Sequence, residues 1–144
     1  MPDTFTIAID LEGVLISNAV SQFPRPGACV FVSACRQAAD RVVLYTSVPG
    51  DRAAEIVARL VAEGHLPEAP FDAIVHAPSS VKPLHGVADV LFDDAADVAP
   101  GEEHRLVRVA GYDPADVDDT VLIDLADRVP GFVRALPARR PGRL

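Results

Sequence analysis

An apolar run near the start of the chain ends abruptly in acidic residues, Thr6-Ile-Ala-Ile-Asp10-Leu-Glu12-Gly13. Side chains of a strand alternate between its two faces, so a run that is apolar on both faces predicts a buried strand of a parallel sheet. Asp10 then lies at the carboxyl end of a central strand, where open α/β folds bind their ligands. Glu12 reaches the same place, and Gly13 lets the chain turn away. Crowded carboxylates favour a divalent cation, but an Asp-rich turn explains this segment equally well by itself.

Two further apolar runs also end in polar residues. The run at 41–45 leads into Thr46 and Ser47, and hydroxyls or free N–H groups just before a helix suit a phosphate. The run at 87–92 leads into Asp93 and Asp94, which extend the acidic pattern. Simple helix capping is the alternative explanation for both pairs.

Lys82 is the only lysine of a chain whose other basic residues are all arginine. Where surface charge is otherwise supplied by arginine, a retained lysine indicates a need for a compact ammonium group instead of a planar guanidinium. A solvated surface lysine is the competing interpretation, and the sequence alone weighs the two equally.

Apolar periodicity predicts strands that alternate with helices. Strands are expected at about 4–10, 41–47, 71–77, 88–93 and 104–110, and helices near 27–39, 51–63 and 116–129, the last of them burying Val117 and ending at Pro130. This alternation predicts an α/β, three-layer Rossmann-like domain over residues 1–136, with a central, mainly parallel sheet and right-handed crossovers. Residues 137–144, rich in Arg, Pro and Gly, are expected to form a flexible basic tail.

The order strand-Asp-X-Glu, strand-Thr-Ser, Lys, strand-Asp-Asp resembles the four motifs of the haloacid dehalogenase (HAD) superfamily of phosphohydrolases. Arg25-Pro26-Gly27 before a helix and the acidic run Tyr112–Asp119 look like its small, cap-free branch, which contains the C-terminal-domain phosphatases and NLI-interacting-factor-like proteins. The connections that follow the first and second motifs are too short for a cap domain, so the site is expected to be open.

The resemblance implies a Mg²⁺-dependent phosphatase that works through an aspartyl-phosphate intermediate on Asp10. It assigns acid/base catalysis to Glu12, phosphate binding to Thr46, Ser47 and Lys82, and metal binding to Asp10, Glu12 (by its backbone carbonyl), Asp93 and Asp94. The family usually has aspartate where this chain has Glu12, and threonine where it has Val14. A catalytically degenerate relative that serves as a binding or regulatory module is therefore the alternative.

Net charge and hydropathy limit the kinds of partner that this protein is expected to bind. A net charge of −8 argues against a nucleic-acid-binding surface, which needs clustered Lys and Arg. No apolar run approaches the ~20 residues of a membrane span, and Met1-Pro-Asp3 does not begin a signal peptide, so a cytoplasmic protein is expected. The expected partner is a phosphorylated substrate, either a small molecule or a phosphoprotein.

Overall fold

The computed structural model describes residues 4–136, so the tail expected at 137–144 lies outside the described residues. Five strands form one sheet: β1 Thr6–Ile9, β2 Arg41–Thr46, β3 Ala73–His76, β4 Val90–Asp93 and β5 Leu106–Arg108. Their order is β3-β2-β1-β4-β5, and every pair of neighbours is parallel. The predicted α/β class and the parallel sheet are confirmed.

The sheet reverses its strand order beside β1. From β1 the chain steps outward to β2 and β3, and it then returns to place β4 on the other side of β1. Ile9 is paired with Phe92, and the Asp10 N–H continues the ladder with a 3.0 Å bond to the Phe92 carbonyl. Asp10 and Asp93 therefore leave the sheet side by side at its switch point, where α/β folds bind ligands.

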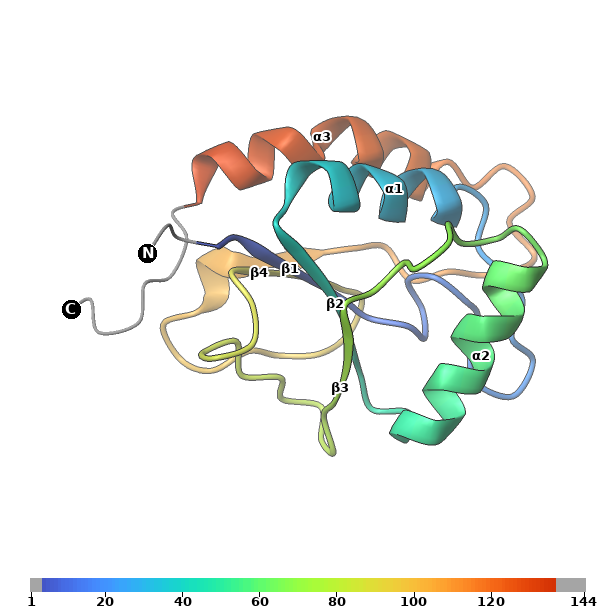
Figure 1. Ribbon diagram of the computed structural model, residues 1–144, viewed down its shortest axis with the longest axis horizontal. Coiled ribbons are helices and arrows are strands. Elements are labelled where there is room, and N and C mark those ends of the chain that lie inside the picture. Colours follow the sequence, from blue (N-terminus) through green and yellow to red (C-terminus); the bar gives the residue numbers. More distant parts are fainter. Residues whose placement is uncertain (1–3, 137–144) are drawn as a thin grey trace.

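Three helices cover one face of the sheet. Helices α1 (Ala28–Ala38) and α3 (Val121–Ala135) lie side by side above the strands, and α2 (Gly50–Ala62) packs beside β3 (Figure 1). Phe92 from β4 anchors this layer, because its ring meets Phe31 of α1 at 5.1 Å and Phe132 of α3 at 5.6 Å between centroids, both edge to face. Edge-to-face ring pairs stabilise the fold beyond the burial of their apolar area, and here they fix the orientation of α1 and α3 on the sheet.

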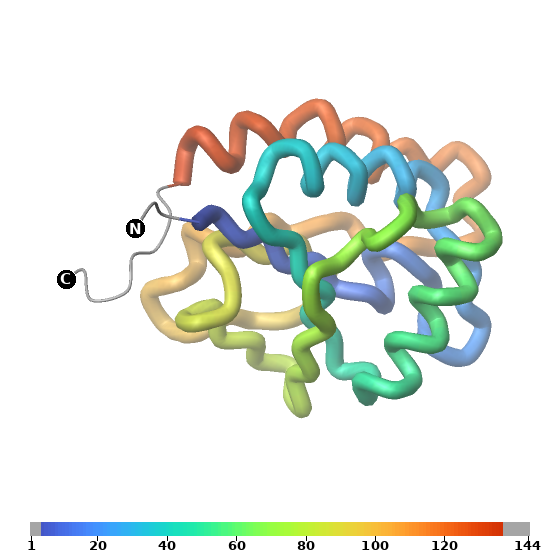
Figure 2. The backbone as a smooth tube through the Cα atoms, in the orientation of Figure 1, coloured from blue at the N-terminus to red at the C-terminus, as the bar shows by residue number. Residues whose placement is uncertain are grey.

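Among the described residues, those that cover the opposite face form no α-helix. Ala8, Val43 and Leu91 project to that side and pack against Leu84 and Ala88. These two residues belong to the long connection that crosses below the sheet from β3 to β4 (Figure 2). The connection completes the third layer of a Rossmann-like fold, and its course brings Lys82 under the carboxyl edge of the sheet.

The prediction for the last helix was wrong at both ends. Residues before Val121 form turns in which the Asp113 and Asp116 carboxylates accept backbone N–H bonds, a local arrangement that competes with helix. Val117, expected to be buried, is 86 % exposed. The helix continues through Pro130 to Ala135 because the apolar side chains beyond the proline still pack on the core, which offsets the lost backbone bond. The other elements lie where expected, with shorter strands.

The connection between β1 and α1 is a compact loop. Isolated bridges join Glu12 to Ile16 and Ile16 to Pro24, so the chain folds back on itself immediately after the first strand. Within residues 4–136 no separate cap domain covers the switch point, as predicted. None of the helices in that range has the length and apolarity needed to cross a membrane.

Candidate functional site

Lys82 lies at the centre of the carboxyl edge of the sheet. Its ammonium nitrogen donates to Asp10 Oδ1 at 2.8 Å, to Asp93 Oδ2 at 2.7 Å and to the Tyr45 backbone carbonyl at 2.9 Å. An ammonium group has three donors, and here each has an acceptor. Lys82 is only 4 % exposed, so the single lysine of the chain is a buried, fully bonded cation and not a surface charge.

Three carboxylates gather around this lysine. Oxygen atoms of Asp10, Asp93 and Asp94 all lie within 4.8 Å of one another. When all three carboxylates are ionised, their three negative charges and the single positive charge of Lys82 leave an excess of two, which matches the charge of one divalent cation. Burial raises the pKa of Asp10 to about 8, with the Lys82 charge opposing and the Asp93 charge adding to the rise. Burial acts to lower the pKa of Lys82, but the Asp10 and Asp93 carboxylates outweigh it, and that pKa is raised.

The two carboxylates at the end of β4, Asp93 in the strand and Asp94 just after it, have different surroundings. Asp93 is buried, and its Oδ1 accepts bonds of 2.9 Å from the backbone N–H groups of both Ala95 and Ala96, while its Oδ2 accepts from Lys82. Asp94 is half-buried, and its carboxylate lies directly against Gly13, which has a positive φ of 82°. Both carboxylate oxygens of Asp93 are thus bonded within the protein interior, whereas the Asp94 carboxylate is directed towards the open side of the cluster.

Glu12 reaches the site from the loop after β1. The residue is half-buried and lines the same cavity as the three aspartates. Its carboxylate Oε2 accepts a 2.7 Å bond from the Ala19 backbone N–H. One carboxylate oxygen therefore has a fixed partner, and the side chain is held in a single direction.

The two hydroxyl residues at the end of β2, Thr46 in the strand and Ser47 just after it, have different surroundings. Ser47 is exposed and lines the cavity. Thr46 is 1 % exposed and is not among the residues lining the cavity, and its Oγ1 accepts a 3.0 Å bond from the Val48 N–H. Thr46 shapes the turn, and Ser47 is the hydroxyl group presented to the cavity.

The cavity at this edge has a volume of about 600 Å³. Sequence reasoning found its carboxylates, Lys82 and Ser47, but it missed several other lining residues: Ser17, Ser79, Ser80, Gly111 and Tyr112. A signal for some of them exists, since Ser79 and Ser80 directly precede Lys82, and Gly111-Tyr112 follows the last strand at the same edge.

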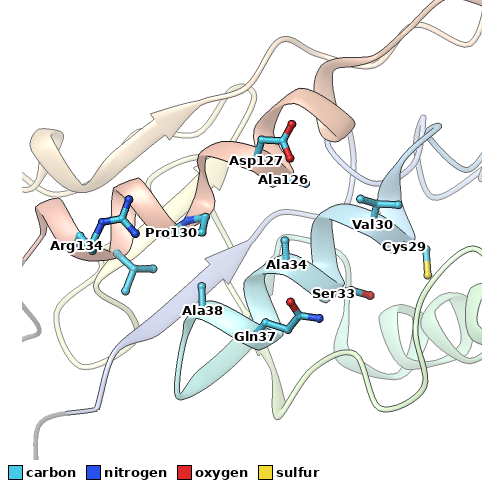
Figure 3. Close-up of a pocket in the computed structure, with 11 residues that line it drawn as sticks. Cys29, Val30, Ser33, Ala34, Gln37, Ala38, Ala126, Asp127, Pro130 and Arg134 are labelled. Atoms are coloured by element: carbon cyan, nitrogen blue, oxygen red, sulfur yellow. The ribbon is translucent and has the colours of Figure 1, made fainter.

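A larger hollow of about 800 Å³ lies between α1 and α3 (Figure 3). Small and apolar side chains such as Ala34 and Ala126 make up most of its wall, and Asp127 and Arg134 are its acidic and basic residues. It contains none of the carboxylates described above. The ionisable cluster at the switch point is therefore the better candidate for chemistry.

No protein-family model and no curated protein matches this chain. The case for a function accordingly rests on the arrangement of side chains at the switch point and on the motif order that supplies them.

Proposed function

We propose that this protein is a Mg²⁺-dependent phosphatase that hydrolyses phosphate monoesters through an aspartyl-phosphate intermediate on Asp10. The observation that carries the proposal is the Lys82 ammonium held between Asp10 and Asp93 at the open end of a parallel sheet. A buried charge pair of this kind is costly to assemble and is found preferentially where it serves a reaction.

The residues present fit a magnesium ion. Mg²⁺ prefers oxygen ligands and is usually held by one or two carboxylates together with water and substrate phosphate. Asp10 and Asp94 would supply carboxylate ligands, and the Glu12 backbone would supply a carbonyl ligand. Asp93 would lie next to these ligands and add its negative charge. With its three aspartates ionised, the cluster has two unbalanced negative charges, which such an ion would neutralise. When bound, the ion would offset the negative charge that gathers on the phosphoryl oxygens.

Lys82 decides which oxygen of Asp10 reacts. Because Oδ1 is hydrogen-bonded to the lysine, Oδ2 is the atom that would attack phosphorus. The new Oδ2–P bond forms as the ester P–O bond breaks, and the Glu12 carboxyl group would give its proton to the departing alkoxide. Glu12 would then take a proton from water as that water attacks phosphorus, which releases inorganic phosphate and restores Asp10. The Ser47 hydroxyl would bind a phosphoryl oxygen.

The open access to the site admits substrates of different sizes. Because residues 4–136 form no cap domain over the cavity, a phosphate carried on a protein side chain could reach Asp10 as readily as a phosphorylated small molecule. The proposed substrate is therefore a phosphomonoester of either kind.

A binding or regulatory module is the second candidate function. It is favoured by the bond between Glu12 and the Ala19 N–H, because a carboxylate held by the loop is less free to shuttle protons. Such a module would bind Mg²⁺ and phosphate without turning over a phosphomonoester.

The deciding experiment measures hydrolysis of p-nitrophenyl phosphate with Mg²⁺ and with EDTA. We expect activity only with Mg²⁺, and none in Asp10→Asn, which removes the nucleophile. Asp97→Asn is the matched control, since Asp97 is a nearby acid whose side chain is 80 % exposed, and it should behave like the parent. Equal rates in EDTA would refute the metal dependence, and an active Asp10→Asn protein would refute the nucleophile. Mg²⁺ binding without any hydrolysis would favour the module.

A further inference from the structure

A buried ion pair outside the Lys82 cluster joins segments that are far apart in the sequence. Arg25 Nε and Asp119 Oδ2 are 2.9 Å apart, and the side chains are only 1 % and 4 % exposed. Buried ion pairs contribute little to stability compared with apolar residues of the same volume, because both charges must be removed from water. The contacts that the pair makes with neighbouring segments therefore matter more than its contribution to stability.

The Arg25 guanidinium contacts two backbone segments of the site. Its Nη1 donates to the Gly13 carbonyl at 3.2 Å, and that same carbonyl accepts a 2.9 Å bond from the Tyr112 N–H. The guanidinium also lies over the Tyr112 ring, 5.5 Å from its centroid. Asp119 is held in turn by the Val121 N–H at the start of α3, at 2.9 Å from its Oδ1. One ion pair thus connects the loop after β1, the segment after β5 and helix α3.

These two backbone segments form the walls around Asp94. A Cβ added to Gly13 would collide with the Asp94 carboxylate, and a Cβ added to Gly111 would lie 3.4 Å from its Oδ2. Asp94 is therefore confined between Gly13 and Gly111. Arg25 holds the first wall through the Gly13 carbonyl and the second through Tyr112, the neighbour of Gly111.

We propose that Arg25 and Asp119 are positioning residues, which keep the Gly13 and Gly111 walls in place and thereby direct Asp94 towards the metal. This inference rests on the proposed function, since it assigns a purpose to the direction of the Asp94 carboxylate. Partners outside the first ligand shell typically alter metal affinity by ~10–100-fold when they are removed.

The test replaces the pair by apolar residues of similar volume, in the double variant Arg25→Met/Asp119→Leu. Such a replacement avoids an unpaired buried charge, so the protein should fold. Two quantities are measured: the Mg²⁺ dissociation constant by calorimetry, and the hydrogen exchange rate of the Tyr112 amide. We expect the dissociation constant to rise at least about tenfold and the Tyr112 amide to exchange faster, while amides in α1 keep the parent rate.

Arg36→Met is the control variant. It removes the 2.6 Å pair with Asp72, which sits next to the start of β3, at the opposite edge of the sheet. Its Mg²⁺ affinity should stay within about twofold of the parent. If the double variant does not fold, Asp119→Asn weakens the same pair without a change in size and is measured in the same way.

The outcomes separate the two proposals. A folded variant whose Mg²⁺ affinity matches that of the parent overturns the positioning role. If the parent itself binds no Mg²⁺, the proposed function fails, and the Tyr112 exchange rate alone decides whether Arg25 and Asp119 brace the walls: a faster rate supports the brace and an unchanged rate overturns it.

Discussion

The Glu12 carboxylate and the Ala19 backbone N–H are joined by a 2.7 Å hydrogen bond, which ties the candidate site to the loop after β1. The carbonyl of Ala19 is held as well, by Arg52 of α2 at 3.1 Å and by the Gln22 side chain at 3.0 Å. The loop is thus fastened on one side to α2 and on the other to the cavity. The glutamate side chain at position 12 is long enough to reach the Ala19 N–H.

Substitutions at Glu12 should separate loop anchoring from proton transfer. Glu12→Gln keeps the length and an acceptor for the Ala19 N–H but removes the acid, so turnover of an alkyl phosphate should fall by ~10²–10⁴. Glu12→Asp keeps the acid but is shorter by about 1.5 Å. It should lose the Ala19 bond, with a fall in turnover of roughly 10²-fold.

Hydrogen exchange of the Ala19 amide checks this interpretation independently of activity. The rate should rise in Glu12→Asp and stay near the parent value in Glu12→Gln. Protection that persists in Glu12→Asp would show that the bond is dispensable. Full alkyl phosphate turnover in Glu12→Gln would exclude Glu12 as the acid.

Lys82→Arg should reduce phosphatase activity at least about tenfold, although the charge is conserved. The ammonium meets three acceptors within 2.9 Å from one nitrogen atom, and a planar guanidinium cannot place its donors at that point. The measurement is kcat with p-nitrophenyl phosphate at saturating Mg²⁺, alongside circular dichroism to confirm folding. A folded Lys82→Arg protein with the parent rate would contradict the role assigned to the lysine.

The stability of the metal-free protein should fall as pH rises from about 4 to 8. Burial raises the pKa of Asp10 from 3.8 in the unfolded chain to about 8 in the folded protein. Between these values the folded state retains a proton that the unfolded state has lost, so the free energy of unfolding decreases as pH rises. The decrease ends above pH 8, where both states have lost the proton. The raised pKa of Lys82 adds no slope here, because both states keep that proton below pH 10.

Thermal unfolding in EDTA across this range provides the measurement. We expect a decrease in Tm of about 4 °C or more, equivalent to ~1 kcal/mol for a domain of this size. Asp10→Asn should lack the component of the decrease that comes from Asp10, and Mg²⁺ should remove it by binding the ionised carboxylate. A parent curve with the same slope as Asp10→Asn would show that Asp10 titrates normally.

Gly13→Ala should weaken Mg²⁺ binding by at least about tenfold. The new methyl group would occupy the place of the Asp94 carboxylate, and the positive φ of 82° is unfavourable for alanine. Gly111→Ala is the matched control on the other wall, because its methyl group would make only a 3.4 Å contact with Asp94. Calorimetric titration with Mg²⁺ compares the two, and equal affinities would show that the Asp94 carboxylate can move without cost.

Local sequence patterns were sufficient to predict the sheet and part of the site. The run that ends in Asp10 and the run that ends in Asp93 are apolar on both faces, a pattern that predicts interior strands of a parallel sheet, and the structure confirms both. Parallel strands bring their carboxyl ends to one edge, which predicts that the two carboxylates meet. Lys82 was singled out by composition, and the structure places its nitrogen between them.

Long-range contacts decided the rest. Nothing in the sequence near Asp119 distinguishes it from its exposed neighbours. In the fold it is buried against Arg25, which lies 94 positions earlier in the sequence. The same holds for the end of α3, where packing on the core outweighs the local penalty at Pro130. Strand ends and their carboxylates follow from periodicity, which is a local property, whereas pairing partners, side-chain direction and helix ends depend on which distant surfaces meet.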